Sequence, residues 1–346
     1  MYEAFFSLNA KPFQLTPDPE FFFASKEHKR AMSYLQYGLD QGEGFIVISG
    51  SIGTGKSTLA KHLVSNLNAQ QVEAVQLVTT SLAPMDLLKL IASGFNLQLP
   101  ADIDKAGLLQ HIEHYLNHNF SQGKRTLLLV DEAQNLPAES IEELRMLSNI
   151  QHDNRPLLQS FLLGQEELRD TLKGANMEQF RQRIIASCHL PPLTSEECRH
   201  YIEHRLKHVG WQNNPAFAPG CFPLIHRYTR GIPRIINLFC DRLMLFTFLE
   251  EANFINEEAI ETVNAEFIQE QEYATLPPSS VGAQVGPANA NSPGGNPDAN
   301  SQVKLLYDHL EEVFQYLDKT MMDKLKLLRY LDKIIKEKNI QNKVNH

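Results

Sequence analysis

The chain has 346 residues, of which 42% are hydrophobic and 21% are charged. This length is sufficient for two domains, or for one domain with added segments, and the apolar fraction can supply a core. The formal net charge of −9 excludes a chain-wide basic field of the kind that attracts nucleic acid or anionic lipid, and leaves only a local basic face open.

The sequence carries no pattern of secretion or of membrane insertion. The start, MYEAFFSLNAKPF, has neither the basic residues nor the long apolar stretch of a signal peptide. Residues 235–249 form the most apolar later segment, but Asp241 and Arg242 interrupt it and it is too short to span a bilayer. The four cysteines form no C-x-x-C pair, which favours buried thiols in a reducing compartment over disulfides or a zinc site. We therefore expect a soluble cytoplasmic protein.

Aromatic residues and prolines crowd the N-terminal segment, residues 1–28. So much apolar surface so early in a chain indicates packing onto the domain that follows. A helix is expected next, over residues 29–40, with Met32, Leu35 and Leu39 on one face.

The strongest motif of the chain is FIVISGSIGTGKST, residues 45–58. Its apolar run at 45–48 has the length and the β-branched content of a buried strand. The run leads into a loop that fits G-x-x-x-x-G-K-[ST] at every fixed position, and leucines at helical spacing follow. Strand, glycine loop and helix are the order that a phosphate cradle needs, because the loop turns its N–H groups inward and the helix start adds positive potential.

This loop predicts a site for ATP and Mg²⁺. Lys56 would reach the β- and γ-phosphates, and the Ser57 hydroxyl would hold Mg²⁺. Two roles are open for Tyr2, Phe6 and Phe13. One of them would lie beside the adenine, or all would pack in the core, which we favour. The residues expected to contact the nucleotide are Gly50, Ser51, Ile52, Gly53, Thr54, Gly55, Lys56, Ser57 and Thr58.

A second nucleotide signature is TLLLVDE, residues 126–132, an apolar strand that ends in two acids. Asp131 would bind Mg²⁺ through water, and Glu132 would polarise the attacking water as general base. A further strand, residues 73–79, lies between the two signatures. An extra strand there, with a glutamate after the aspartate, points to the additional-strand, catalytic-glutamate branch of the nucleotide hydrolases rather than to kinases or GTPases.

Strands alternate with helices along this part of the chain, which predicts an α/β fold. Helices are expected at residues 87–95, 108–116 and 141–150, and another strand at 157–163. The alternation implies a parallel sheet covered on both faces, with its ligand at the C-terminal ends of the strands.

Three polar residues near the end of this domain are candidates for contact with the γ-phosphate. Gln165 follows the strand at 157–163 and would touch the γ-phosphate or its water, although a loop glutamine without a role explains its position equally well. Arg181 and Arg183 lie in FRQRII, and in a ring such an arginine reaches a neighbour's γ-phosphate. On a helix, arginines are more often solvated or salt-bridged.

A small all-helical unit is predicted after the sheet. Thr194 and Glu197 have the spacing of a capping box at a helix start. Arg234 follows Pro233 at another helix start, where the helix dipole disfavours a cation, and this misfit suggests an anionic partner such as a phosphate. The expected helices cover residues 194–209, 218–228, 233–249 and 256–271.

The composition changes at Tyr273. Residues 274–302 are rich in Pro, Gly, Ser, Ala and Asn and almost free of charge, which is typical of a flexible linker. Residues 303–338 read as one long helix whose apolar spacing contains a four-residue stutter. This helix would form a short coiled coil or dock on a partner, or else fold back onto its own body.

These boundaries divide the chain into five parts. The expected parts are an aromatic and proline-rich segment packed on the ATPase core (1–28), a nucleotide-binding domain (29–192), a helical lid (193–272), a linker (273–302) and a coiled-coil or docking helix (303–338).

Seven segments together resemble the general secretion pathway protein A group of AAA+ ATPases, which includes ATPases of exosortase and exopolysaccharide loci and has an AAA+ domain of the origin-recognition type. They are MYEAFF, KPFQLTPDPEFFFAS, GFIVISGSIGTGKST, LLLVDEAQNL, EELRMLSNI, LLGQEELRD and GIPRIINLFCDRL. The resemblance covers residues 1 to about 271. It implies an AAA+ P-loop αβα sandwich with a parallel sheet and a helical lid, and to these this chain adds a long C-terminal helix.

The resemblance also implies roles for single residues. Gln165 is similar to sensor 1 and Arg234 to sensor 2, and Arg183 is our choice for the arginine finger, with Arg181 as the alternative. Close relatives carry an Asn that restrains the catalytic glutamate where this chain has Thr79. The Walker positions are Lys56, Ser57, Asp131 and Glu132.

A second departure concerns the C-terminal part, because longer secretion members continue into a transmembrane helix and a peptidoglycan-binding domain. We expect a wholly cytoplasmic member, peripheral at the inner membrane only through a partner. It would assemble into a ring or partial ring and hydrolyse ATP-Mg to remodel or regulate a partner in bacterial envelope secretion, pilus or exopolysaccharide assembly, with the C-terminal helix recruiting that partner. The alternatives are a DNA-associated AAA+ regulator of the transposition or replication-initiator type and a nucleotide-dependent scaffold of slow turnover.

Overall fold

The computed structural model describes residues 1–16, 18–100 and 102–275. The chain divides into two compact units, Met1–Asn264 and Ala265–His346. Of the second unit only the end of helix α12 (Glu257–Thr275) is described. Residues 273–275 thus continue this helix instead of opening the predicted linker, and the rest of that linker and the predicted helix at 303–338 lie outside the described residues.

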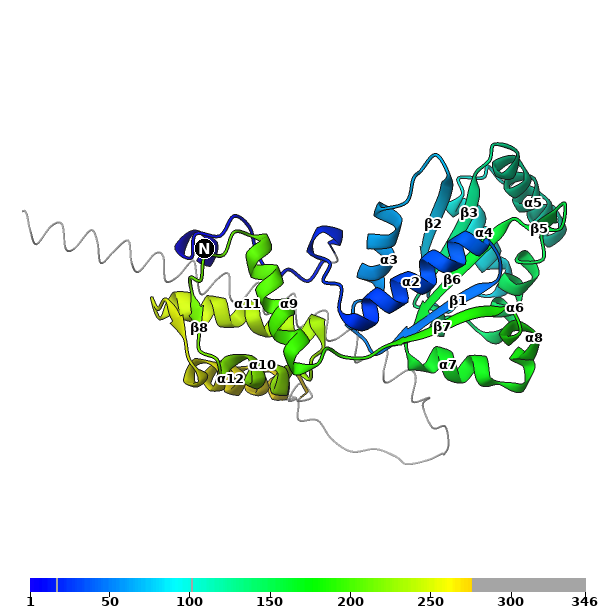
Figure 1. Cartoon of the computed structure of the whole chain (residues 1–346). Coiled ribbons are helices and arrows are strands. Elements are labelled where there is room, and N and C mark those ends of the chain that lie inside the picture. Colours follow the sequence, from blue (N-terminus) through cyan, green and yellow to red (C-terminus); the bar gives the residue numbers. More distant parts are fainter. Residues whose placement is uncertain (17, 101, 276–346) are drawn as a thin grey trace, which may run out of the picture. The chain divides into compact units, whose positions relative to one another are not determined.

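A five-stranded parallel sheet forms the centre of the nucleotide-binding part (Figure 1). Its strands, in spatial order, are β2 (Val72–Val78), β3 (Arg125–Asp131), β6 (Leu158–Gly164), β1 (Phe45–Gly50) and β7 (Ile184–Leu190). The strand before the glycine loop, β1, and the strand that ends in the two acids, β3, both pair with β6. The strand predicted at residues 73–79 is present as β2, but it lies at the edge of the sheet, and β6 is the strand between β1 and β3.

Side chains of alternate residues point to opposite faces of the sheet, so each face has its own helical layer. Ile46 and Ile48 pack with α2 (Lys26–Gln41) and α3 (Lys56–Ser65). Phe45 and Val47 point to the other face and belong to the second core. The helices on that face are α4 (Pro84–Gly94), α5 (Lys105–Ser121), α6 (Ala138–Leu147), α7 (Glu166–Lys173) and α8 (Glu178–Arg181), with the 3-10 turns η2 (Ala133–Asn135) and η3 (Ala175–Met177) and the hairpin of β4 (Gln151–His152) and β5 (Arg155–Pro156) nearby.

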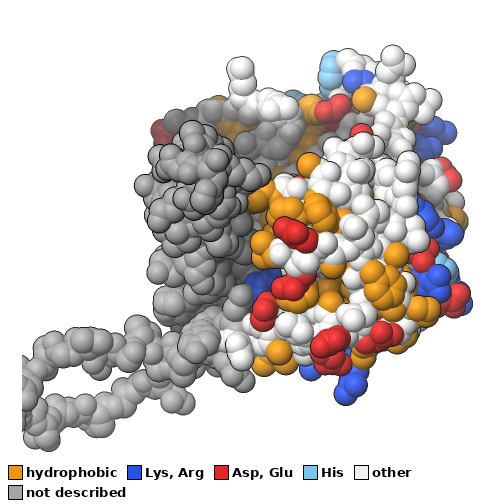
Figure 2. All heavy atoms as spheres, turned by 90° about the vertical axis from the view of Figure 1, so that its left-hand side faces the viewer, with side chains coloured by type: hydrophobic (Ala, Val, Ile, Leu, Met, Phe, Trp, Pro, Cys, Tyr) orange, Lys and Arg blue, Asp and Glu red, His pale blue; other side chains and the backbone are white. Residues whose placement is uncertain are grey.

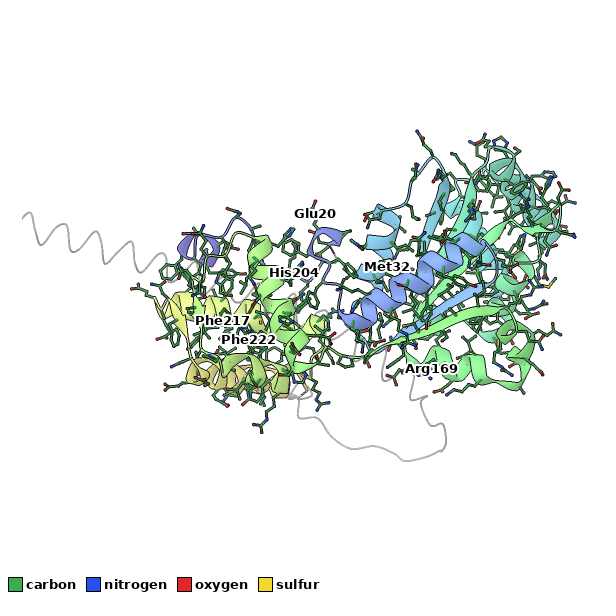
Figure 3. All side chains as sticks on the ribbon, in the orientation of Figure 1. Glu20, Met32, Arg169, His204, Phe217 and Phe222 are labelled. Carbon is green, nitrogen blue, oxygen red and sulfur yellow. The ribbon has the colours of Figure 1, made fainter. Side chains whose placement is uncertain are left out.

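The lid has a core of its own. It is built from α9 (Ser195–His208), α10 (Cys221–Thr229), α11 (Pro233–Leu249) and the start of α12. The expected capping box of Thr194 and Glu197 begins α9. Phe217 and Phe222 stack with their ring centroids 5.4 Å apart inside this unit (Figure 3). We had predicted a purely helical lid, and this is wrong. The strands β8 (Ala216–Phe217) and β9 (Phe254–Ile255) form a short parallel pair.

The N-terminal segment packs mainly on the lid and not on the nucleotide-binding domain. It contains α1 (Tyr2–Phe5) and the 3-10 turn η1 (Pro19–Phe21). Tyr2, Phe6 and Phe13 are buried in the lid core, so packing rather than adenine contact is their role. A smaller contact is made with the nucleotide-binding domain, where Phe22 packs on the core behind α2 and α3 and η1 lies against α3. The expectation that the segment covers the ATPase core is therefore largely wrong.

One strand of the central sheet, β7, was absent from the prediction. We had assigned Arg183 to a helix, but α8 ends at Arg181 and β7 begins at Ile184. This edge strand is only partly buried and contains Ser187 and His189, so its apolar pattern is interrupted. No helix within the described ranges is long and apolar enough to cross a membrane.

Candidate functional site

The glycine loop lies between β1 and α3, where the sequence predicted it. Gly53 and Gly55 have φ values of +81° and +96°, a region that side chains disfavour and that turns the loop around its own N–H groups. The Lys56 side chain is buried, and its Nζ donates hydrogen bonds to the carbonyl oxygens of Gly50 at 2.8 Å and Ser51 at 3.0 Å. The loop is therefore folded as a compact cradle with the lysine at its centre.

A pocket opens above this cradle. Residues 52–58 of the loop line the pocket, together with Glu132 at the end of β3 and residues of the lid such as Arg234. The N-terminal segment supplies Phe21 and its neighbours. Gly50 and Asp131 do not line it: Gly50 holds Lys56, and the side chain of Asp131 is buried beneath. A second opening beside it is lined by Ser51, Ile52, Gln165, Glu166, Glu167, Ile232, Arg234 and Ile235.

The two acids at the end of β3 face the cradle. Burial raises the pKa of the Asp131 carboxyl, while hydrogen bonds from the Ser57 side chain and the Glu132 N–H oppose that rise. Burial also lowers the pKa of the Lys56 amine, and the charges of Glu132 and Asp131 oppose it. The hydrogen bond from Ser57 and the charges of both acids near Lys56 place these four residues in one site.

A hydroxyl and a carboxylate in contact are a suitable set of donors for Mg²⁺, which prefers oxygen ligands and keeps several waters or phosphate oxygens. Ser57 and Asp131 are such a pair. No group of three or more His, Cys, Asp or Glu residues that would suit a metal occurs in the part of the chain that the structure describes. Ser57 and Asp131 thus offer two oxygen ligands that fit Mg²⁺.

Glu132 adopts a left-handed backbone conformation, with φ of 55°, which turns the chain sharply after β3. Its carboxylate lines the pocket and accepts a hydrogen bond from Gln134 Nε2 at 2.7 Å. Gln165, at the end of β6, approaches the same oxygen with its Nε2 at 3.5 Å. The structure thus brings Gln165 to the predicted base, as a residue next to the γ-phosphate position would require.

Arg234 reaches the cradle from the lid. Its main-chain N–H donates to the carbonyl of Gly53 at 3.2 Å. A Cβ on Gly53 would lie 2.7 Å from Arg234 Cβ, so glycine is needed for this approach. The side chain is exposed, and within the described residues it forms no ion pair with a carboxylate. An anion in the pocket would satisfy it.

Arg183 lies away from this cradle. Its carbonyl accepts from the N–H of Phe45, the first residue of β1, so five residues of extended strand, roughly 17 Å, separate it from Gly50. Its guanidinium donates to the Ser148 hydroxyl at 3.3 Å. Arg181 donates instead to the carbonyls of Leu172 and Gly174. Neither arginine is placed to act on the nucleotide of its own chain.

Two residues of the site have no counterpart in the sequence-based prediction. Gln134 follows the two acids and gave no signal beyond its position in DEAQ. His28 lines the pocket, accepts from the Ser25 hydroxyl at Nδ1 and donates from Nε2 to the Thr54 carbonyl at 3.1 Å. A single histidine near a helix start has no pattern that predicts contact with a loop 26 residues away.

Comparisons with known proteins agree with this fold. The family model of the AAA domain matches residues 39–172. General secretion pathway protein A of Aeromonas hydrophila is 38% identical over 248 residues, which are 72% of this chain and 45% of that protein. The chain therefore spans slightly less than half of the length of this relative.

Two solved structures show the same fold at low sequence identity. The ORC2 protein of Aeropyrum pernix, in ADPNP and ADP complexes, has a TM-score of 0.58 at 18% identity and covers 78% of this chain and 75% of its own. Cdc6p of Pyrobaculum aerophilum has a TM-score of 0.57 at 15% identity, with coverage of 80% and 74%. The chain carries an AAA+ domain, and it resembles the general secretion pathway protein A group of AAA+ ATPases.

Proposed function

We propose that this chain binds and hydrolyses ATP-Mg, and that it uses the energy to remodel or regulate a partner protein in bacterial envelope secretion, pilus or exopolysaccharide assembly. One observation carries the hydrolytic part: Lys56, Glu132 and Arg234, from three separate elements, line a single pocket. The AAA domain match supports nucleotide hydrolysis in general.

Each residue has a role in this proposal that follows from its chemistry. The loop amides and Lys56 bind the phosphates, and Ser57 with Asp131 holds Mg²⁺, which neutralises charge that develops on the phosphoryl oxygens. Glu132 takes the proton of the attacking water, and Gln165 helps to orient that water. Arg234 binds the γ-phosphate from the lid, so the lid responds to hydrolysis.

An arginine from a neighbouring copy completes the site in this proposal. Arg183 lies at the N-terminal end of the strands, whereas its own cradle lies at the C-terminal end of β1, so it is available to an adjacent subunit in a ring or partial ring. Turnover per subunit should then rise with protein concentration, since the finger is supplied only on assembly.

The envelope role rests on the likeness to General secretion pathway protein A. Because the chain spans 45% of that protein, we propose the role for this chain without extending the whole protein's partners to it. We also propose that it works in the cytoplasm, peripheral at the inner membrane through its partner, and that residues 303–338 recruit that partner.

The test is a pair of substitutions with opposite signatures. Lys56→Ala should abolish ATP binding in calorimetry, whereas Glu132→Gln should bind ATP and release almost no phosphate. Glu139→Gln is a control on α6, because that residue lines neither pocket. Normal phosphate release by Glu132→Gln would disprove the assignment of the base.

A DNA-associated role is the second choice. Figure 2 shows acidic side chains among hydrophobic ones on the visible face, with Lys and Arg gathered towards one margin. The likeness to solved structures supports the fold alone at these identities. Salt-dependent binding of duplex DNA, measured with and without ATP, would test this alternative.

A further inference from the structure

The side chain of Gln134 bridges two residues of the candidate site. Its Nε2 donates to Glu132 Oε2 at 2.7 Å, and its Oε1 accepts from the main-chain N–H of Gln165 at 2.9 Å. One amide group therefore connects the end of β3 with the end of β6, the two strands that carry the predicted base and the predicted γ-phosphate sensor.

The orientation of this amide follows from its partners. A carboxylate only accepts hydrogen bonds and a main-chain N–H only donates. Gln134 must therefore point its NH₂ group towards Glu132 and its oxygen towards Gln165, since the flipped amide would lose both bonds. The contact to the carboxylate is short because it is charge-assisted.

The contacts of Thr79 and Gly164 support a restraining role of Gln134 on the carboxylate of Glu132. The hydroxyl of Thr79, although close by, donates to the main-chain oxygens of Asp131 and Glu132 and not to the carboxylate. Gly164 provides the space for the bridge, because a Cβ there would lie 3.0 Å from Gln134 Oε1. The restraint on the carboxylate of Glu132 thus comes chiefly from Gln134, at 2.7 Å, since Gln165 Nε2 lies 3.5 Å from the same oxygen.

We propose that Gln134 is the positioning residue for Glu132, and that it couples the orientation of this base to the main chain at Gln165. The proposal rests on the proposed ATP hydrolysis. Gln134 holds Glu132 Oε2, which leaves Oε1 to accept the proton from water while the water oxygen bonds to the γ-phosphorus and ADP leaves with the electrons of the broken P–O bond. Displacement of Gln165 would move the amide and thereby the base.

Two substitutions at this position separate positioning from simple packing. Gln134→Ala removes the donor, so kcat should fall by about tenfold to a hundredfold, as expected when a general base loses its orientation. The dissociation constant for ATP should change little, because Gln134 does not line the pocket. The exposed Gln110→Ala on α5 is the matched control.

Gln134→Glu gives a readout that packing would not move. Two carboxylates would then face each other, and their repulsion favours the protonated form. The acid limb of the pH profile of kcat should therefore shift to higher pH in Gln134→Glu and not in Gln110→Ala. Wild-type kcat and an unshifted profile in both Gln134 variants would overturn the proposal, as would a loss of ATP affinity that matches the loss of kcat.

A double-mutant cycle tests the bridge independently of turnover. The unfolding midpoints of Gln134→Ala, Glu132→Ala and the double variant should be non-additive, because the two side chains share a hydrogen bond. Additive midpoints would overturn the proposal even if the enzyme is active. Absence of ATPase activity in the wild-type protein would instead count against the proposed function, and the cycle would still decide about the bridge.

Discussion

The hydroxyl of Thr79 shares its single proton between two main-chain oxygens, that of Glu132 at 3.0 Å and that of Asp131 at 2.9 Å. Thr79 is almost fully buried at the end of β2. Its function is therefore to fix the turn that carries both acids, and not to restrain the carboxylate of the base.

Thr79→Val keeps the shape of this side chain and removes the hydroxyl donor. Both carbonyls keep a main-chain donor, the N–H of Thr79 for Asp131 and the N–H of Asn135 for Glu132. We therefore expect only the loss of a typical hydrogen bond, about 0.5–1.5 kcal/mol of stability. Thermal unfolding measures it, and the exposed Thr80→Val is the control. Equal unfolding midpoints for the two variants would contradict the assigned role.

The burial of the His28 imidazole predicts that the stability of the fold depends on pH. Burial lowers the pKa of this imidazole, and its hydrogen bond to the Thr54 carbonyl and the charge of Glu197 oppose the effect. The unfolded chain, with a pKa of about 6.5, then binds a proton more readily than the folded chain does. The contribution of His28 to the free energy of unfolding is fully present above the pKa of the unfolded chain. It is lost as the pH falls through the lower pKa of the folded chain.

The measurement is the unfolding midpoint between pH 7.5 and pH 5, compared with that of His28→Gln, which cannot titrate but can still donate to Thr54. The wild-type midpoint should fall more steeply on acidification than that of the variant. His114→Gln, at an exposed position on α5, should follow the wild type. Parallel curves for the wild type and His28→Gln would show that this histidine does not set the dependence.

Arg183→Ala should lower ATP turnover by about a thousandfold if it removes a finger that acts on a neighbouring subunit. The variant retains its own cradle, and Glu132→Gln retains its own Arg183. Mixing the two inactive proteins should therefore restore phosphate release, since each mixed interface can contain one complete site. Arg181→Ala should stay active per folded molecule, because that side chain bonds the carbonyls of Leu172 and Gly174. Failure of the mixture to recover activity would refute a finger at Arg183.

The parts of the fold that the sequence predicts are those with a strong local pattern. The β1 strand, the glycine loop and β3 are recognisable because the cradle needs fixed glycines and the strands are continuous apolar runs. The edge strand β7 is only half-buried, so its residues alternate weakly and resemble the end of a helix. Tyr2 and Phe13 were correctly expected to be buried. An aromatic side chain, however, does not reveal whether it packs in the core of the lid or in that of the sheet.

The site divides in the same way. Lys56 and Glu132 are predicted by motifs whose spacing follows from the shape of a triphosphate. Gln134 and His28 act through contacts that depend on where distant segments meet, Gln165 in one case and Thr54 in the other. Such contacts are set by tertiary packing, and a single sequence carries no periodicity that reveals them.

The guanidinium of Arg205 fixes the N-terminal segment at the pocket. It is buried at 6% exposure, donates to the carbonyl of Pro12 at 2.7 Å and to the Tyr201 hydroxyl at 3.2 Å, and lies 4.8 Å from the centre of the Phe21 ring. A lysine is a point charge and cannot reproduce this fork of donors. Arg205→Lys should therefore cost about 2 kcal/mol of stability.

The more specific consequence concerns the segment itself. Residues 13–16 should exchange their amide hydrogens faster in Arg205→Lys, because the carbonyls of Pro12 and Gln14 that the guanidinium holds are released. ATP affinity should fall as well, since Gln14 and Phe21 line the pocket together with Arg205. The exposed Arg199→Lys on α9 controls for a general change in the lid. Unchanged exchange at residues 13–16, together with a lower unfolding midpoint, would show that Arg205 belongs to the lid core and has no part in forming the pocket.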